Sequence, residues 1–472
     1  MTNWLPDLTT GSGPLYQRLA DSIETDIDRG VIGAGAKLPP QRDLAYDIGT
    51  TVGTVGRAYQ LLRERGLVSG EVGRGTYVLG QRSDDTTTDL LASDPHVEGT
   101  RYIDAPRGKL RFDSTAAPDI GQGDIVADVL SRTAQDHPYE ISSYTRDFPD
   151  RWFEAGCHWL SRNSFRPSRD GIVPTLGTHA AVMAAIAALT TPGDYIIFEH
   201  LTYSQISRSA GLIGRRTALV TSDDEGLDPE DFERVCAQKH PKMMFLMPTA
   251  KNPTLVTLSA TRREAIARVA REYNVILIED DLYGDLTDDP TPLLAEYAPE
   301  RTIVAGGLSK SVAAGVRGGW LACPPAYRHR IRVAHKMLTG GLPFLLAEVC
   351  SRLVLSGQAS EMRKRSIVDI NARIAIVRKT LAGFDFKAVD NVPFVWLTLP
   401  DPWLSGTFKN ACLEHGVLID DEDEFKAGRS EQVFHGVRFG VSQPSRREDI
   451  AGGVGVIRRL LDEGRAGYDS FS

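Results

Sequence analysis

Residues 302–320 read TIVAGGLSKSVAAGVRGGW, and this stretch decides how the larger part of the chain folds. An uncharged, β-prone run comes first, and a lysine, Lys310, and an arginine among glycines, Arg317, follow it. Three similar apolar runs precede it: YIIFE at 195–199, KMMFLMP at 242–248 and VILIEDD at 275–281. Stretches with helical periodicity, such as THAAVMAAIAALTTPGD and TRREAIARVAREYN, separate these runs. Continuous apolar strands that alternate with helices predict an α/β fold with a mostly parallel sheet.

The chain after this region has a different pattern. From about residue 345 it continues with the helical stretch EMRKRSIVDINARIAIVRKTLAG and then with two strand-like runs, VPFVWLTLP and GVRFGVS. This order predicts a small C-terminal α+β subdomain that closes over the larger one.

The first eighty residues predict a separate module. Apolar residues recur every four positions from Leu15 to Ile27, and two further short helical patterns follow, at 39–49 and 50–66. We expect the third helix to turn Val52, Val55, Tyr59 and Leu62 inward. The run LVSGEVGRGTYVLG then has two β-prone segments around a glycine-rich tip, which is typical of a hairpin. These elements predict an N-terminal winged helix-turn-helix domain over residues 10–80, a polar linker over 81–105 and a second domain over 106–465.

Composition limits the class of protein. The chain has 472 residues, a formal charge of −8 and 42% hydrophobic residues, which is ordinary for a soluble globular protein of several domains. It has no long uncharged apolar run, and its N-terminus lacks the pattern of a signal peptide, so we expect a cytoplasmic protein. Its five cysteines have wide spacings that suggest neither a disulfide framework nor a metal site.

Polar residues follow the predicted strands at the positions where ligands gather in open α/β sheets. The candidates are Tyr203 after YIIFE, Asn252 after FLMP, Asp280 at the end of VILIED with Tyr283 three residues on, and Lys310 after TIVAGGLS. Gly177 and Thr178 open a helix whose free N–H groups favour an anion, and Arg317 adds a positive charge. A lysine, an aspartate, a stacking aromatic, an asparagine and an anion cradle are what pyridoxal 5'-phosphate requires.

With these motifs the chain resembles two known families. Residues from about 110 to 460 resemble a fold-type I aminotransferase, and residues 10–80 resemble a GntR-type winged helix; their fusion resembles the MocR/GabR transcription regulators. The resemblance implies that Lys310 forms the Schiff base, that Asp280 holds the pyridine nitrogen, and that Asn252 and Tyr283 donate to the phenolic oxygen. It further implies ring stacking by Tyr203, phosphate binding by Gly177, Thr178 and Arg317, effector carboxylate binding by Arg438, and a reach of Tyr144 across a homodimer to the phosphate of the neighbouring subunit.

The same resemblance implies a DNA-binding surface. Arg42 lies near the start of the second helix, and Thr51, Thr54 and Arg57 lie near the start of the third, which would enter the major groove of operator DNA. Arg74, at the tip of the hairpin, would contact the backbone or minor groove. Residues 1–80 have eight Arg or Lys and nine Asp or Glu, so we expect modest affinity for each module and binding as a dimer.

Several alternatives remain open from the sequence. Tyr203 could be a core aromatic, Arg438 could pair with an acid of the run at 420–424, and that run, DDEDE, could be a solvated loop or could border the pocket. The N-terminal module could bind protein. The favoured function is a regulator that senses a small amino compound through aldimine exchange at Lys310. The alternative is a catabolic aminotransferase with an appended winged helix, because every residue needed for turnover is present.

Overall fold

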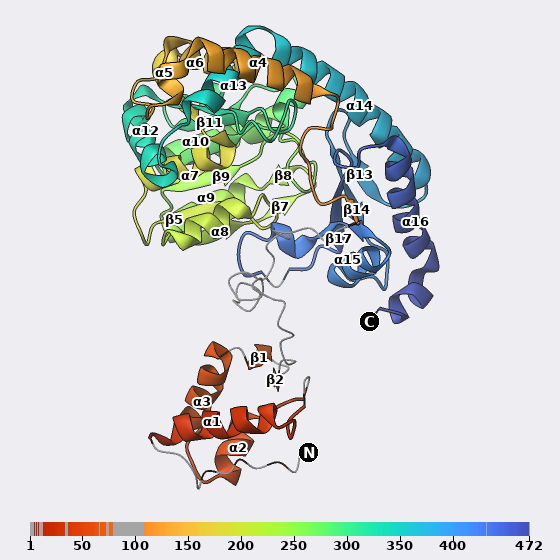
Figure 1. The fold of residues 1–472 in the computed structure, drawn as a ribbon. Coiled ribbons are helices and arrows are strands. Elements are labelled where there is room, and N and C mark those ends of the chain that lie inside the picture. Colours follow the sequence, from red (N-terminus) through yellow and green to blue (C-terminus); the bar gives the residue numbers. More distant parts are fainter. Residues whose placement is uncertain are drawn as a thin grey trace. The chain divides into compact units, whose positions relative to one another are not determined.

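The computed structural model describes Trp4, Pro6, Leu8 and residues 13–33, 36–65, 67–71, 75–78, 108–430 and 432–471. The chain forms two compact units, Met1–Thr100 and Arg101–Ser472 (Figure 1). The linker predicted over 81–105 lies outside the described residues. Over the described part of the chain, no helix combines the length and the apolar character needed to cross a membrane.

The N-terminal unit is three helices followed by an antiparallel strand pair, as predicted. Its elements are α1 (Leu15–Asp28), α2 (Gln41–Asp47), α3 (Val52–Glu64), β1 (Val68–Glu71) and β2 (Gly75–Val78). The inward faces form one core in which Leu19, Ile23, Leu44, Val55 and Leu62 are buried. The prediction for Val52 is wrong: its side chain is 45% exposed, because it is the first residue of α3 and precedes the turn at which that helix meets the core.

A seven-stranded sheet organises the C-terminal unit. Its strand order is β4-β12-β11-β10-β9-β5-β6, and only β12 runs antiparallel to its neighbours. The strands are β4 (Ile172–Thr175), β5 (Tyr195–Glu199), β6 (Arg216–Val220), β9 (Met243–Leu246), β10 (Ile276–Asp280), β11 (Thr302–Gly307) and β12 (Gly319–Ala322). The mostly parallel α/β prediction is therefore confirmed.

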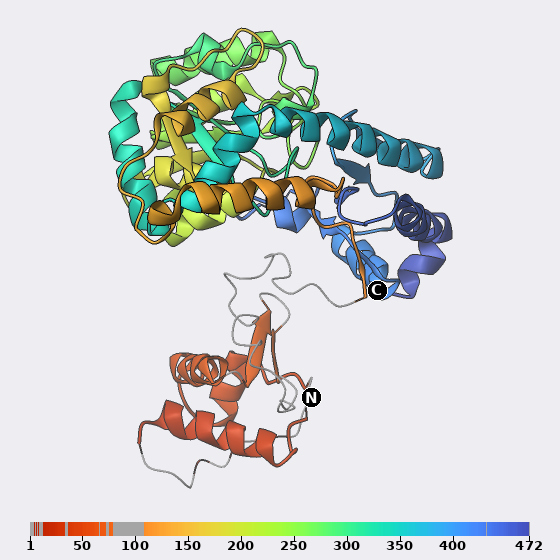
Figure 2. The same ribbon diagram turned by 45° about the horizontal axis from the view of Figure 1, so that its top comes forward.

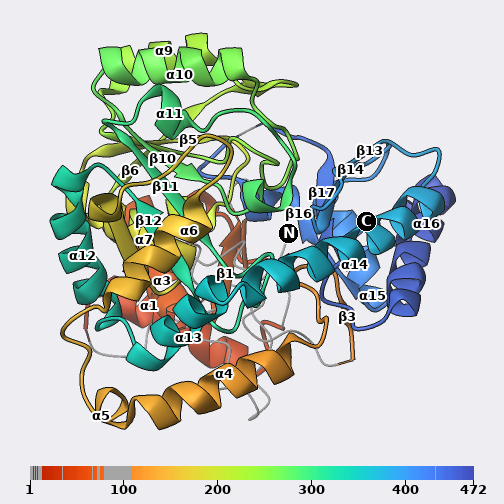
Figure 3. The same ribbon diagram turned by 90° about the horizontal axis from the view of Figure 1, so that it is seen from above.

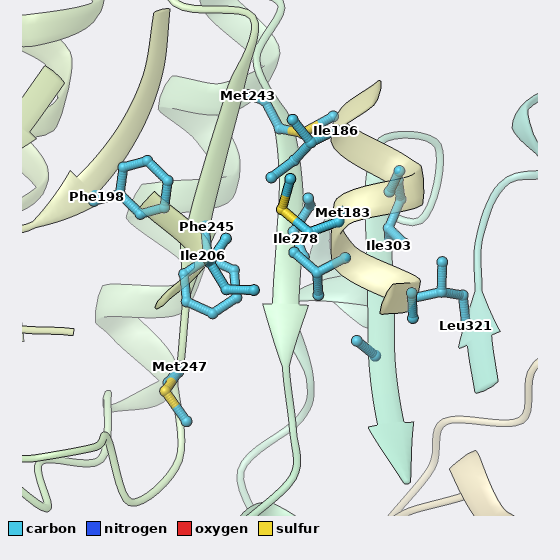
Figure 4. Close-up of a cluster of buried hydrophobic side chains, with 14 of the residues drawn as sticks. Met183, Ile186, Phe198, Ile206, Met243, Phe245, Met247, Ile278, Ile303 and Leu321 are labelled. Atoms are coloured by element: carbon cyan, nitrogen blue, oxygen red, sulfur yellow. The ribbon is translucent and has the colours of Figure 1, made fainter. Parts of the chain in front are cut away.

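Helices cover both faces of this sheet, because its strands are apolar at successive positions. Phe198, Phe245 and Ile278 point to one face, where α7 (Gly177–Leu189) packs with Met183 and Ile186 (Figure 4). Their chain neighbours on β5, β9 and β10 point to the other face and pack against α9 (Pro229–Lys239) and α10 (Ala260–Glu272). The core is thus continuous on both sides of the strands whose carboxyl ends carry the candidate site.

Further helices border this layer. They are α4 (Gln122–Asp136), α5 (Pro138–Ile141), α6 (Asp150–Leu160), α8 (Gln205–Leu212), α11 (Leu294–Tyr297), α12 (Pro325–Thr339) and α13 (Phe344–Leu355), with a short strand pair, β7 (Ser222–Asp223) and β8 (Gly226–Leu227). Although we expected the small subdomain to begin near 345, α13 packs with α6 in the larger part, where Val349 and Leu353 are buried.

A four-stranded antiparallel sheet forms the small subdomain. Its strands are β13 (Phe386–Ala388), β14 (Phe394–Thr398), β16 (Asp420–Asp421) and β17 (Gly436–Gly440), and its helices are α14 (Gln358–Thr380), α15 (Ser405–Glu414) and α16 (Arg447–Asp469). The long α14 extends to it from the larger part (Figures 2 and 3). One strand comes from far away in the sequence: β3 (Leu110–Arg111) pairs in parallel with β15 (Val417–Leu418). This pairing brings residues 112–117 to the junction of the two parts.

Candidate functional site

A cavity of about 230 Å³ lies where β9, β10 and β11 end and α7 begins. We call it the Lys310 cavity. Eight of the ten residues predicted for the cofactor and effector site line it, namely Gly177, Thr178, Tyr203, Asn252, Asp280, Tyr283, Lys310 and Arg317. They come from segments as far apart as 177 and 317, and the parallel strands bring them to one edge of the sheet. Tyr144 and Arg438 are not among its lining residues.

Lys310 follows β11 and is half-buried in the cavity wall. Its Nζ donates a hydrogen bond to Thr115 Oγ1 over 3.0 Å and lies 5.8 Å from the centre of the Tyr283 ring. The Tyr283 hydroxyl and Thr115 Oγ1 are 2.7 Å apart. Thr115 therefore links the lysine to the tyrosine.

Thr115 is a site residue that the sequence analysis missed. It lies in FDSTAAPD, a stretch with neither strand nor helix periodicity, and it reaches the cavity because β3 pairs with β15 nearby. Ser114 and Ala116 line the cavity with it. The pairing joins distant segments through strands of two residues, so the sequence carried no local signal that could have revealed it.

Asp280 ends β10 with its carboxyl group buried beside the cavity. Burial raises the pKa of this carboxyl to about 7, and the positive charge of Lys310 opposes the shift. Leu282 N–H donates to its Oδ1 over 3.2 Å. The adjacent Asp281 lies outside the cavity wall, where it forms an ion pair with Arg162. The neighbouring acids thus have different surroundings, and only Asp280 faces the cavity.

The start of α7 forms one end of the cavity. Gly177 has φ +78°, and a Cβ there would lie 3.7 Å from the guanidinium carbon of Arg317. The exposed Arg317 has φ +52° itself, which holds the side chain against the helix N-terminus. Free N–H groups, the helix dipole and a guanidinium make this end suitable for a phosphate.

His335, which sequence reasoning did not select, contacts the residue before this helix start. Leu176 N–H donates to His335 Nε2 over 3.0 Å, and the imidazole is 2% exposed. Burial lowers the pKa of His335 to about 4, so that the ring stays neutral and its Nε2 can accept this hydrogen bond.

Tyr203, which follows β5, and His179, in the first turn of α7, form another part of the cavity wall. Their rings meet edge to face with centres 6.2 Å apart, and His179 Nε2 lies 3.3 Å from Ser209 Oγ. Tyr203 also packs against the main core. It is therefore both a core neighbour and a cavity residue, which joins the two alternatives left open by the sequence.

Arg438 is fully buried in β17, directly opposite Asp420 of β16. Its Nη2 forms an ion pair with Asp420 and donates to the carbonyl oxygen of Asp113 over 2.8 Å. Its Nη1 donates to Asn252 Oδ1 over 3.1 Å. The guanidinium is thus linked to the cavity through Asn252, which lines it.

The solvated-loop interpretation of the acidic run at 420–424 is wrong. Asp420, Glu422 and Glu424 are buried, and the run forms ion pairs with Arg438, Lys409 and Lys426. Only Asp423 is exposed. The run therefore packs in the folded interior, where Glu424 also forms an ion pair with Arg208 of α8 in the larger part.

Tyr144 lies on the surface, apart from the Lys310 cavity. Its side chain is 90% exposed, on a loop that lines a separate hollow of about 1000 Å³ between His137 and Arg151. Its reach into a neighbouring subunit therefore stays a prediction.

The predicted DNA-binding residues lie around α2 and α3 in the N-terminal unit. Arg42, Thr51 and Arg57 are exposed and Thr54 is half-buried. Thr51 also caps α3, because its Oγ1 accepts a hydrogen bond from Thr54 N–H over 3.2 Å. Arg74 lies outside the described residues.

Two family models match the chain. Residues 15–78 match bacterial regulatory proteins of the gntR family, and residues 154–432 match aminotransferase class I and II. The curated relatives include the uncharacterized HTH-type transcriptional regulator YdeF of Bacillus subtilis, which is 30% identical over 98% of this chain and 97% of the relative. The vitamin B6 salvage pathway transcriptional repressor PtsJ of Salmonella typhimurium is 27% identical over 68% of this chain and 70% of the relative.

Solved structures share the fold of the C-terminal unit. A multiple substrate aminotransferase from Thermococcus profundus has a TM-score of 0.68 at 20% identity, covering 76% of this chain and 92% of that one. LysN, an α-aminoadipate aminotransferase from Thermus thermophilus, has a TM-score of 0.67 at 20% identity, covering 78% and 94%. These neighbours confirm the aminotransferase fold.

Proposed function

We propose that occupancy of the Lys310 cavity controls the DNA binding of this chain, which belongs to the MocR/GabR-type HTH transcriptional regulators. In these regulators a gntR-family domain precedes an aminotransferase class I and II domain. The protein is a transcription regulator. The observation that carries the sensing proposal is the cavity itself, where a lysine amine, a buried carboxyl and a helix N-terminus meet in a chain that also has a helix-turn-helix.

Pyridoxal 5'-phosphate is the cofactor, and the donor set of the cavity fits it. Asp280 supplies a buried carboxyl to the cavity. Among the described lining residues the one arginine is Arg317, which lies at the start of α7. We propose that Asp280 holds the pyridine nitrogen, that Gly177, Thr178 and Arg317 hold the phosphate, and that Lys310 makes the covalent bond. When bound, the cofactor supplies an aldehyde that condenses with primary amines.

The remaining residues of the wall fix the orientation of the ring in this proposal. Tyr203 stacks on it, and Asn252 and Tyr283 donate to its phenolic oxygen. Asn252 is itself held by Arg438, and Tyr283 by Thr115, so both donors have defined positions. Preorganised donors of this kind bind without reordering their side chains.

We propose that the effector is a small amino compound, because an amine, Lys310 Nζ, already lies in the wall of the cavity and exchanges with other primary amines at the cofactor aldehyde. The wall combines Ser114–Ala116, near the small subdomain, with the ends of strands of the large sheet. A ligand that contacts both sides has different affinities for different arrangements of the two parts, and this difference can drive a conformational change.

The dimer is also a proposal. A second copy that covers the exposed Tyr144 loop would bring two DNA-binding modules together, and two modules on two half-sites would compensate for the low charge of each. Tyr144 would then contact the phosphate of the partner copy.

One titration of the full-length protein tests the function. Visible absorbance reports the lysine-bound cofactor, and binding to DNA from upstream of its own gene is measured as primary amines are added. We expect an amine to change both signals together. After borohydride reduction, mass spectrometry should find the cofactor on Lys310 and find no label in Lys310→Ala. Rapid release of a keto acid without any DNA binding would support the catabolic aminotransferase instead.

A further inference from the structure

We propose that Asp420 acts as an internal carboxylate that occupies Arg438, so that the Lys310 cavity selects a primary amine without a carboxylate on its amine-bearing carbon. This inference rests on the proposed function and specifies its ligand class. The juxtaposition that carries it is the buried Arg438–Asp420 pair behind Asn252.

The pair is built into the sheet of the small subdomain. Asp420 and Arg438 are direct cross-strand partners on β16 and β17, with side chains that are 4% and 0% exposed. The guanidinium also lies over the Phe425 ring, with its carbon 4.8 Å from the ring centre. Strand register and aromatic packing therefore hold both partners in place.

The nitrogen that a bidentate ligand carboxylate would need, Arg438 Nη2, already donates to two other acceptors. An arginine binds a carboxylate most strongly through two N–H groups side by side. Here Nη2 donates to Asp420 and to the carbonyl oxygen of Asp113, and Nη1 donates to Asn252. A ligand carboxylate must displace Asp420 to form the same bond.

Displacement is costly because Asp420 is buried. Removing its cation would leave a carboxylate that is 3% exposed beside Glu424, which is also buried. Breaking a buried ion pair is strongly unfavourable, and a new pair with the ligand would only replace the one that was lost. Exchange of one carboxylate for another thus brings little net affinity.

The cavity offers no other cation for this purpose among the described residues that line it. Lysine and arginine occur there only as Lys310 and Arg317, which the proposed function assigns to the covalent bond and the phosphate. His179 does not replace them, because burial and the charge of Arg317 lower its pKa. A carboxylate next to the effector amine therefore meets no further lysine or arginine in the described wall of the cavity.

A matched pair of probes tests the proposal on the full-length, cofactor-loaded protein. L-Norvaline and n-butylamine differ only by the carboxylate, and their affinities are measured from visible absorbance and from DNA binding. For the wild type we expect n-butylamine to bind at least as tightly as L-norvaline. In Asp420→Asn, Arg438 loses its carboxylate partner, and we expect L-norvaline to gain about tenfold while n-butylamine changes by less than about threefold.

Asp423→Asn is the matched control, because Asp423 belongs to the same acidic run but is exposed and pairs with Lys426 over 2.8 Å. It should leave the preference unchanged. Thermal unfolding checks that the Asp420→Asn variant is folded. If the variant does not fold, the relative affinity of the wild type for the two probes still tests the proposal. A wild type that prefers L-norvaline by tenfold or more would overturn the proposal. Absence of any response to either probe would instead contradict the proposed function.

Discussion

Lys310 Nζ donates a hydrogen bond to Thr115 Oγ1, although 195 positions separate the two residues in the chain. Thr115 is 2% exposed, and the same oxygen lies 2.7 Å from the Tyr283 hydroxyl. The reactive amine of the large sheet is thus positioned by a segment that packs beside the small subdomain. Movement of that segment would therefore displace the hydrogen-bond acceptor of Lys310 Nζ.

Thr115→Val should slow attachment of the cofactor to Lys310. Valine has a similar shape but no hydroxyl, so the amine and the Tyr283 hydroxyl both lose a buried partner. A lost hydrogen bond of this kind is worth about 1 kcal/mol, and we expect the rate to fall about five- to tenfold. The rate is measured as the rise of visible absorbance after mixing cofactor-free protein with pyridoxal 5'-phosphate. Thr115→Ser keeps the oxygen and should react at nearly the wild-type rate; equal slowing in both variants would exclude a role for the hydroxyl.

Titration of the Asp280 carboxyl should lower the free energy of unfolding of the cofactor-free protein as the pH rises from about 4 to 7. Its pKa is about 7 in the folded protein and 3.8 as its ordinary value, so between these values the folded state holds a proton that the unfolded state has released. The free energy of unfolding therefore falls over this interval, by on the order of 3 kcal/mol. Urea unfolding at pH 5 and pH 8 measures it.

Asp280→Asn isolates this contribution from those of Glu279 and Asp285, whose pKa values are also raised. Asparagine does not titrate, so the variant should lose less stability than the wild type between the two pH values. Equal losses in both proteins would show that Asp280 has an ordinary pKa.

His335→Leu should weaken phosphate binding at the start of α7. Leucine leaves the Leu176 N–H without the acceptor that now lies 3.0 Å away, and an unsatisfied buried donor costs about 1–3 kcal/mol. We expect about a tenfold loss in affinity for pyridoxal 5'-phosphate, measured by equilibrium titration. In the wild type, stability should fall as the pH drops from 6.5 towards 4, because the unfolded imidazole binds a proton that the folded one does not.

His335→Gln provides the control, because its side-chain oxygen is able to accept the same hydrogen bond. Restored affinity with glutamine supports the positioning role. If leucine and glutamine bind the cofactor as tightly as histidine does, His335 has no part in it.

The sequence predicted the residues that follow strands, because the carboxyl ends of parallel strands share one edge wherever the sheet forms. Lys310, Asp280 and Asn252 could be found in this way. Thr115 could not, because its place depends on the pairing of β3 with β15 across three hundred residues of chain. His335 lies on α12, and the amphipathic pattern of that helix already accounts for its burial. The sequence therefore carries no separate sign that His335 accepts a hydrogen bond at the start of α7.

Charge was the least predictable property. The run DDEDE is strongly polar, and polar runs are usually solvated, yet three of its acids are buried opposite cations from α15, β17 and the residues after the run. The sequence contains both partners of each pair but not the strand register that joins them. For the same reason Arg438 could be named as a candidate while its partner could not be decided.

Arg57→Ala should weaken DNA binding without weakening the fold of the N-terminal unit. Arg57 is exposed in the first half of α3, the helix expected to enter the major groove, whereas the core residues Val55 and Tyr59 point inward. If Arg57 contacts a phosphate, its loss should lower affinity and reduce the slope of log affinity against log salt by about 1. A base contact should cost about 1–3 kcal/mol for the preferred operator and less for unrelated DNA. Arg63→Ala, in the last turn of α3, is the matched control, because the same charge is removed far from the helix start. Binding measured at several salt concentrations separates the cases, and equal effects of the two variants would contradict the expected docking of α3 by its N-terminal half.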